Sequence, residues 1–166
     1  VPMVLEGTAK RIKGMGDQEA RDFLGGRMRV IYSGAASLDH SCRERFESLG
    51  ISIYFFYGMT EMCIGISAET PGHKLLGSVG KPFGNVEVRL DNPNANGDGE
   101  IVIKKDYPMT AYYKNPEETA RTLKDGWLHS GDLGRLDEDG FLYVTGRLKN
   151  VIILSNGENI SPEELE

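Results

Sequence analysis

Five consecutive residues, Tyr57-Gly58-Met59-Thr60-Glu61, combine side chains that suit a nucleotide. They follow an apolar strand-like run, and the ends of such strands are where α/β sheets place ligand sites. The aromatic ring can stack on a base, and the glycine permits close approach. The threonine hydroxyl can donate to a phosphate oxygen, and the carboxylate can hold the Mg²⁺ that accompanies ATP. A purely structural turn is the alternative interpretation of the same residues.

Three further groups of residues offer matching chemistry. Ser33-Gly34-Ala35-Ala36 ends another strand-like run, and its small side chains would let a flat ring lie against the backbone. Asp132, in Ser130-Gly131-Asp132, could accept hydrogen bonds from both ribose hydroxyls, and Arg147 offers a guanidinium for phosphate or ribose. The simpler interpretations are a strand-to-helix turn, a hairpin carboxylate and a surface ion pair.

Other patterns in the sequence fail on their spacing. Gly77–Pro82 has two residues between its glycines where a phosphate loop has four, and a proline follows its lysine, so it indicates a turn. Asn92–Gly97 resembles the start of a calcium loop, but Ile103 occupies the closing glutamate position. His129–Asp132 lacks the nucleophile elbow of a hydrolase. The histidines and cysteines lack zinc-site spacing.

The elements that must position these residues change in character along the chain. Up to about Gly80 the pattern alternates helices and strands, which predicts an α/β layer with parallel strand pairing. The expected helices lie near residues 2–13 and at 39–48, and the expected strands at 28–32, 51–56 and 64–68.

After Gly80, short alternating strands separated by turn-rich segments predict an antiparallel β-sheet or distorted β-barrel. One helix should begin at Asn115, with Pro116 in its first turn. A strand at 151–154 and a capping pattern at Ser161 predict a new unit. The expected strands are 86–90, 100–104, 133–136 and 141–145, and the expected units are 1–80, 81–148 and 149–166.

Composition narrows the class of protein. The 166 residues contain 39% hydrophobic residues and carry a formal charge of −6, with basic residues scattered along the chain, which argues against binding to nucleic acid or an anionic membrane. The two cysteines are too few for a disulfide framework, so we expect reduced thiols and a cytoplasmic protein. The sequence contains no apolar run of membrane-spanning length and begins with no signal-peptide pattern.

The order and spacing of these segments resemble the adenylate-forming superfamily, which includes acyl-CoA synthetases, luciferases and peptide-synthetase adenylation domains. The resemblance rests on SGAASL at 33–38, YGMTE at 57–61, GSVGKPF at 77–83 and the long run from Asp125 to the end. The forms RLKN and LSNGEN look most like long-chain acyl-CoA synthetases. The resemblance implies the later part of the N-terminal domain, a hinge and the start of the C-terminal domain.

The resemblance also implies roles for individual residues. Ser33–Ala36 and Tyr57–Glu61 would surround adenine and the phosphates, and Ser155–Asn159 would line the channel for the acceptor thiol. Met62, Cys63, Ile64 and Gly65 would line the acyl pocket, with core packing as the alternative. The implied catalytic residues are Thr60 and Glu61, the nucleotide-binding residues are Gly34, Ala35, Ala36, Tyr57, Gly58, Met59, Thr60, Asp132 and Arg147, the magnesium ligand is Glu61 and the hinge residue is Lys149.

The implied activity is ATP-dependent activation of a carboxylic acid, here a fatty acid, to an acyl-adenylate, followed by transfer to CoA. ATP or AMP, Mg²⁺ and CoA are the expected ligands. The family's phosphate loop and C-terminal lysine are missing from the sequence, so we expect a fragment that is inactive alone. Transfer to a carrier-protein phosphopantetheine and a non-catalytic nucleotide-binding homologue are the alternatives, and the oligomeric state is left open.

Overall fold

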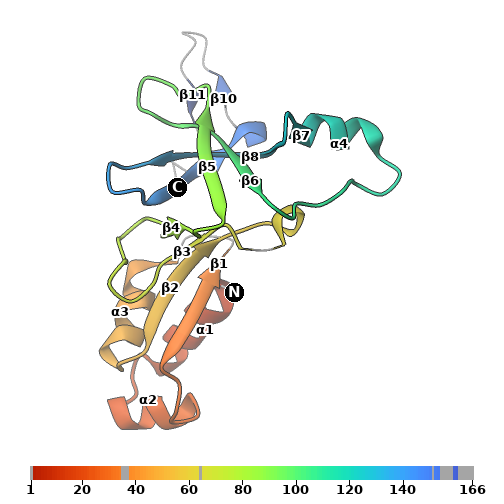
Figure 1. The fold of residues 1–166 in the computed structure, drawn as a ribbon. Coiled ribbons are helices and arrows are strands. Elements are labelled where there is room, and N and C mark those ends of the chain that lie inside the picture. Colours follow the sequence, from red (N-terminus) through yellow and green to blue (C-terminus); the bar gives the residue numbers. More distant parts are fainter. Residues whose placement is uncertain (1, 35–37, 64, 151, 154–158, 161–166) are drawn as a thin grey trace.

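The chain folds into an α/β part followed by a part made mainly of antiparallel strands (Figure 1). The structure is a computed structural model, and it describes residues 2–34, 38–63, 65–150, 152–153 and 159–160. The predicted fold class, an α/β layer followed by an antiparallel sheet, is confirmed.

A four-stranded sheet in the order β1-β2-β3-β4 forms the α/β part, and buried side chains of three helices share one hydrophobic core with β2. Ile12, Phe46 and Ile53 are at most 1% exposed in this core, which explains why the intervening segments form amphipathic helices. The elements are α1 (Pro2–Ile12), α2 (Asp17–Phe23), β1 (Val30–Gly34), α3 (His40–Ser48), β2 (Ser52–Tyr57), the 3₁₀ turn η1 (Thr60–Met62), β3 (Ser67–Ala68) and β4 (Lys81–Pro82).

The predicted parallel pairing holds for β1 and β2, which run from Val30 opposite Ser52 to Gly34 opposite Phe56. It is wrong for β3, which pairs antiparallel with β2. The chain reverses after η1, where Cys63 adopts the left-handed conformation and its carbonyl accepts a hydrogen bond from the Gly65 N–H. The strand predicted at 64–68 therefore shortens to two residues among those described.

The second part is a five-stranded antiparallel sheet in the order β5-β6-β8-β7, with β9 paired to β8. The predicted helix is confirmed, because the Asn115 side chain caps α4 by accepting from the Glu118 N–H at 3.1 Å. The elements are β5 (Val86–Asp91), β6 (Gly99–Lys105), α4 (Pro116–Thr122), β7 (Leu123–Lys124), β8 (Trp127–Leu136), β9 (Leu142–Arg147) and the 3₁₀ turn η2 (Leu148–Asn150).

The end of the chain is described only in part. β10 (Ile152–Ile153) and β11 (Asn159–Ile160) pair antiparallel, in agreement with the strand predicted at 151–154. The predicted loop at 155–158 and the helix start at Ser161 lie outside the described residues. The longest helix of the described chain is α1, and none of the described helices is long and apolar enough to cross a bilayer.

The segment before β4 fastens the two parts together. The Val79 N–H donates to the Leu142 carbonyl at 2.8 Å, and the Leu142 N–H donates to the Gly80 carbonyl at 2.9 Å. Gly80 has φ +79°, and a Cβ there would lie 1.8 Å from the Ala68 carbonyl carbon, so this position requires glycine. The segment 77–82 was predicted as a turn, but its last two residues form β4. Val79 and Gly80 connect the two sheets.

The hydrophobic cores do not divide at residue 80, the boundary expected from the sequence. Tyr57, the last residue of β2, already belongs to the core of the second part, as do Met62 and Ile66, which follow β2. Their partners are Val86, Ile101, Ile103, Leu128 and Leu142. The division into domains therefore stays a prediction, and the end of β2 is the place where the two cores meet.

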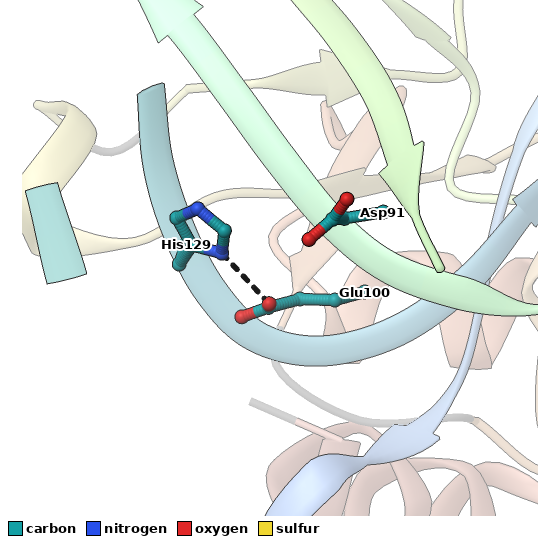
Figure 2. A group of neighbouring side chains, drawn as sticks. All are labelled: Asp91, Glu100 and His129. Carbon is teal, nitrogen blue, oxygen red and sulfur yellow. Dashed lines mark hydrogen bonds and ion pairs between the residues drawn. The ribbon is translucent and has the colours of Figure 1, made fainter. Parts of the chain in front are cut away.

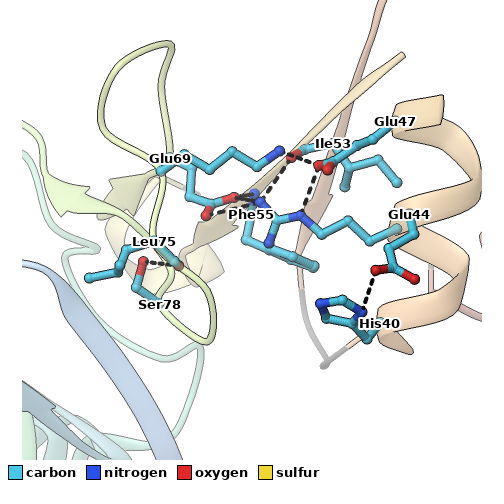
Figure 3. Close-up of polar contacts among 10 residues, drawn as sticks. His40, Glu44, Glu47, Ile53, Phe55, Glu69, Leu75 and Ser78 are labelled. Atoms are coloured by element: carbon cyan, nitrogen blue, oxygen red, sulfur yellow. Dashed lines mark hydrogen bonds and ion pairs between the residues drawn. The ribbon is translucent and has the colours of Figure 1, made fainter. Parts of the chain in front are cut away.

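A buried ion pair joins α3 to the segment that follows β3 (Figure 3). Arg43 Nη2 lies 3.1 Å from Glu69 Oε2, and the Glu69 side chain is fully buried. The same carboxylate accepts the Phe55 N–H at 2.9 Å, and the Arg43 guanidinium lies 5.0 Å from the centre of the Phe55 ring. The pair therefore sets how α3 lies against β2.

Replacement of Glu69 by alanine removes the buried partner of Arg43 and leaves its guanidinium with Glu47, 3.0 Å from Nε and 37% exposed. We therefore expect the free energy of unfolding to fall by about 3 kcal/mol, the lower end of the cost of breaking a buried ion pair. Urea denaturation of the protein that carries this chain measures the change. Glu44→Ala is the matched control, because its ion pair with His40 is largely exposed and should contribute less than about 0.5 kcal/mol. Equal losses in the two variants would contradict the prediction.

Candidate functional site

Asp132 of β8 lies between the ends of two other strands. Its Oδ2 accepts a hydrogen bond from the Tyr57 hydroxyl, at the end of β2, at 2.7 Å. Its Oδ1 lies 3.1 Å from Nε of Arg147, the last residue of β9. The structure therefore brings together three of the residues that the sequence singled out, two of them 75 positions apart.

The Tyr57 side chain is committed to this contact and to the second core. Only 9% of the residue is exposed, and burial, together with the negative charge of Asp132, raises its pKa far above the usual range. Tyr57 therefore stays a neutral donor to the carboxylate. Little of its ring face is open to a stacked base, so its hydrogen bond to Asp132 is the role that the structure displays.

A bulge in β8 directs Asp132 toward Tyr57. Gly131 has φ +71°, a conformation that favours glycine, and the pairing of β8 with β6 shifts at this point. The Ser130 hydroxyl donates to the Ile101 carbonyl at 2.6 Å and accepts from the Asp132 N–H at 3.0 Å. Hydrogen bonds of the Ser130 side chain thus replace part of the backbone pairing between β6 and β8 beside Asp132.

Thr60 and Glu61 lie on η1, which begins three residues after the end of β2. Thr60 is exposed, and Glu61 Oε1 accepts a hydrogen bond from the Tyr112 hydroxyl at 2.8 Å. The Glu61 carbonyl also accepts from the Met109 N–H at 2.7 Å. Burial and the hydrogen bond to Glu61 raise the pKa of Tyr112. The segment before α4 therefore holds Glu61 in place.

Sequence reasoning missed Tyr112, which lies 51 residues from Glu61 and outside every pattern that pointed to chemistry. Its neighbour Tyr113 is 88% exposed, so residue type alone could not have distinguished the two. The two tyrosines differ only in the folded chain, where the 107–113 segment lies against η1 and places the Tyr112 hydroxyl on Glu61.

The donor chemistry at Glu61 fits a hard divalent cation. Its second carboxylate oxygen accepts no hydrogen bond from the residues that the structure describes, and the exposed hydroxyl of Thr60 is adjacent in sequence. Mg²⁺ is bound through one or two carboxylates together with substrate phosphates. The assignment of Glu61 as a magnesium ligand is compatible with these contacts and stays a prediction.

The remaining predicted nucleotide residues flank the end of β2. Gly34 ends β1 opposite Phe56, and a Cβ there would come within 2.7 Å of the Phe56 ring, so the backbone and ring pack closely. Gly58 is half-buried, and the extended Met59 packs against the second core. Ala35 and Ala36 lie outside the described residues. The carboxyl ends of the parallel strands β1 and β2 thus meet at the site.

The residues predicted for the acyl pocket differ in burial, and the predicted hinge residue is exposed. Met62 is 1% exposed and belongs to the second core, in agreement with the core-packing alternative, whereas Cys63 is exposed and Gly65 half-buried. Ile64 lies outside the described residues. Lys149 is exposed on η2, just after Arg147.

Comparison with known proteins gives consistent matches. FadD15 of Mycobacterium bovis, a long-chain-fatty-acid–CoA ligase, is 34% identical over 149 residues, which cover 90% of this chain and 24% of the relative. The long-chain-fatty-acid–CoA ligase ACSBG2 of Gallus gallus is 39% identical over 136 residues, which cover 81% of this chain and 18% of the relative.

A solved structure, O-succinylbenzoate coenzyme A synthetase (MenE) from Bacillus subtilis in complex with AMP, superposes with a TM-score of 0.79. It is 31% identical, and the match covers 99% of this chain and 34% of that protein. MenE has also been solved in complex with ATP and magnesium ion. The chain therefore spans about a third or less of the proteins it matches.

The family model described as "AMP-binding enzyme" matches residues 1–113, the stretch that carries Gly34, Tyr57 and Glu61. The fold and the spacing of these residues point to the same group of proteins, and the resemblance seen in the sequence is confirmed. The chain belongs to the AMP-binding enzyme family.

Proposed function

We propose that the protein carrying this chain activates a fatty acid with ATP and transfers the acyl group to CoA. The observation that carries the proposal is the Asp132 carboxylate, held between Tyr57 and Arg147 at the carboxyl end of β2. Membership of the AMP-binding enzyme family and the names of FadD15 and ACSBG2 support it.

In the first half-reaction a carboxylate oxygen of the acid attacks the α-phosphorus of ATP, and the bond to the bridging oxygen of pyrophosphate breaks. The acyl-adenylate and pyrophosphate are the products. In the second, the sulfur of CoA attacks the acyl carbon, AMP leaves with the electron pair of the broken C–O bond, and the thiol loses its proton. Such reactions depend on positioning and charge neutralisation.

The proposed role of Asp132 is to accept hydrogen bonds from the ribose hydroxyls. Arg147, whose side chain is 70% exposed, is free to turn its guanidinium toward ribose or phosphate, and its exposed pairing with Asp132 costs little to rearrange. Tyr57 keeps the carboxylate in place, and Gly34, Gly58 and Met59 form the surroundings of adenine.

Thr60 and Glu61 are proposed to act on the phosphates, with Glu61 holding Mg²⁺. When bound, the cation would neutralise charge on the phosphate oxygens. The exposed Thr60 hydroxyl can donate to a phosphate oxygen, and Tyr112 orients the Glu61 carboxylate. The exposed Lys149 lies on η2, two residues after the proposed nucleotide residue Arg147, and is proposed as the hinge.

The choice of acid and acceptor is also part of the proposal, because MenE is named for O-succinylbenzoate and not for a fatty acid. Pyrophosphate exchange by the full-length protein with fatty, aromatic and amino acids identifies the acid. Thioester formation with CoA, compared with a phosphopantetheinylated carrier protein, identifies the acceptor. Nucleotide binding without exchange would establish the non-catalytic alternative.

We also propose that the protein carrying this chain is located in the cytoplasm.

Replacement of Asp132 by alanine should weaken binding of ATP and AMP to the full-length protein by at least about tenfold, because hydrogen bonds from ribose to a charged group are lost. Calorimetric titration measures the affinity. Glu138→Ala is the matched control, since Glu138 is an exposed carboxylate at the opposite end of the β8–β9 hairpin. Unchanged affinity in a folded Asp132→Ala protein would remove Asp132 from the site.

The Tyr112→Phe variant removes one hydroxyl and leaves the ring. If Tyr112 orients a magnesium ligand, the Mg²⁺ concentration for half-maximal adenylation should rise about tenfold, the size typical of residues that support metal ligands. The assay is pyrophosphate exchange across a magnesium titration.

Tyr113→Phe controls for the loss of a tyrosine hydroxyl in the same segment, because the Tyr113 side chain is exposed, and it should leave the magnesium dependence unchanged. A Tyr112→Phe enzyme with the wild-type magnesium requirement would show that this hydrogen bond only stabilises the fold.

A further inference from the structure

We propose that Glu100 is a positioning residue for the nucleotide site, acting through the bulge that presents Asp132. The inference rests on the proposed role of Asp132 in ribose binding. Glu100 lies on β6, and among the described residues its side chain hydrogen-bonds to His129 and to the backbone N–H of Gly131, next to Asp132. Its function is to set the direction of the Asp132 carboxylate.

Both oxygens of Glu100 contact β8 on the two sides of Ser130. Oε1 accepts the Gly131 N–H at 3.0 Å, and Oε2 lies 2.8 Å from His129 Nδ1, the contact drawn in Figure 2. The side chains of His129 and Glu100 are 15% and 17% exposed, so water competes weakly for these bonds. The Glu100 carboxylate thus holds both His129, where the bulge begins, and Gly131, the central residue of the bulge.

The pairing of β6 with β8 explains why a side chain is needed there. Val102 lies opposite His129 and Glu100 lies opposite Leu133, so two steps along β6 match four steps along β8. The extra residues cannot follow the regular ladder, and their backbone donors need other acceptors. Glu100 supplies one for Gly131, and Ser130 supplies one for Asp132.

The next link leads directly to the site. Gly131 precedes Asp132 and has φ +71°, so its backbone dihedrals decide where the Asp132 side chain points. The Tyr57 and Arg147 contacts of Asp132 require that direction. If the Gly131 N–H loses its acceptor, the bulge can relax while Tyr57 and Arg147 stay in place. Loss of this acceptor is therefore expected to weaken recognition of the ribose hydroxyls by Asp132 and to leave the fold intact.

Asp91 provides the main competing explanation. Ligand atoms of Asp91, Glu100 and His129 all lie within 4.8 Å of one another, and two carboxylates with an imidazole could hold a divalent cation (Figure 2). Both oxygens of Glu100 are nevertheless already engaged with β8. Positioning therefore uses contacts that exist, whereas a cation would have to share or displace them.

The test separates the reach of the side chain from its charge. Glu100→Gln keeps an acceptor oxygen at the same distance but loses the charge, whereas Glu100→Asp keeps the charge but is one methylene too short for the Gly131 N–H. The full-length enzyme is assayed by kcat/KM for ATP and for 2′,3′-dideoxy-ATP, which lacks both ribose hydroxyls. Asp91→Asn is the matched control from the same cluster.

We expect the wild-type enzyme to prefer ATP, and Glu100→Asp to lose about tenfold of that preference through weaker use of ATP. Glu100→Gln and Asp91→Asn should keep the preference within about twofold. A loss that is equal for ATP and the dideoxy analogue would indicate a purely structural role and overturn the proposal. So would a Glu100→Asp enzyme that keeps the wild-type preference.

Two other outcomes have distinct meanings. If the wild-type enzyme uses both nucleotides equally, the proposed ribose role of Asp132 fails, and the inference about Glu100 falls with it. If Glu100→Gln and Asp91→Asn are both impaired, and a titration with Mn²⁺ or Zn²⁺ alone shows binding to the wild-type protein that both variants lose, the cluster holds a cation and positioning by Glu100 is overturned.

Discussion

A carboxylate removed from water must be paired, and Asp132 is the place where this requirement organises the molecule. The residue is 9% exposed, and the Tyr57 hydroxyl, buried by the second core, donates to it. Because Tyr57 is also the last residue of β2, the bond ties the end of the α/β part to the middle of the antiparallel sheet. The site therefore lies where the two cores meet.

The two partners of Asp132 differ in a way that suits ligand binding. Tyr57 is enclosed and neutral, so its hydrogen bond holds one carboxylate oxygen in a constant position. The Arg147 side chain is 70% exposed, and an ion pair with an exposed partner contributes little to stability. One side of the carboxylate is thus rigid, while the other can exchange its protein partner for a ligand at low cost.

Several structural devices support this arrangement at a distance. Gly80 allows the segment before β4 to pack against the Ala68 backbone and to hydrogen-bond with Leu142, which sets how the sheets approach. The Arg43–Glu69 pair orients α3 against β2. The Tyr112–Glu61 hydrogen bond holds a residue of the candidate site, and the Glu100–Gly131 hydrogen bond holds the backbone next to Asp132. Each comes from a segment remote in sequence.

The sequence by itself determined the features that depend on neighbouring residues. Alternation of apolar residues placed β1, β2, β5, β6, β9 and the end of β8, and capping chemistry placed α4 at Asn115. The short strand β7 and the first residues of β8 were not predicted. The types and order of residues in YGMTE and SGD indicated the nucleotide chemistry, and their spacing indicated the family. The polar helix α2 escaped prediction because Ala20 is its one buried residue and leaves no periodic signal.

Only the tertiary structure decided which of these residues meet. Tyr57 and Asp132 are 75 positions apart, and Glu61 and Tyr112 are 51 apart, so no local pattern could connect them. The direction of β3 depends on the reversal at Cys63, and the direction of Asp132 depends on a bulge that shifts strand register. Strand pairing and register are set by packing between distant segments, whereas periodicity and capping act over a few residues.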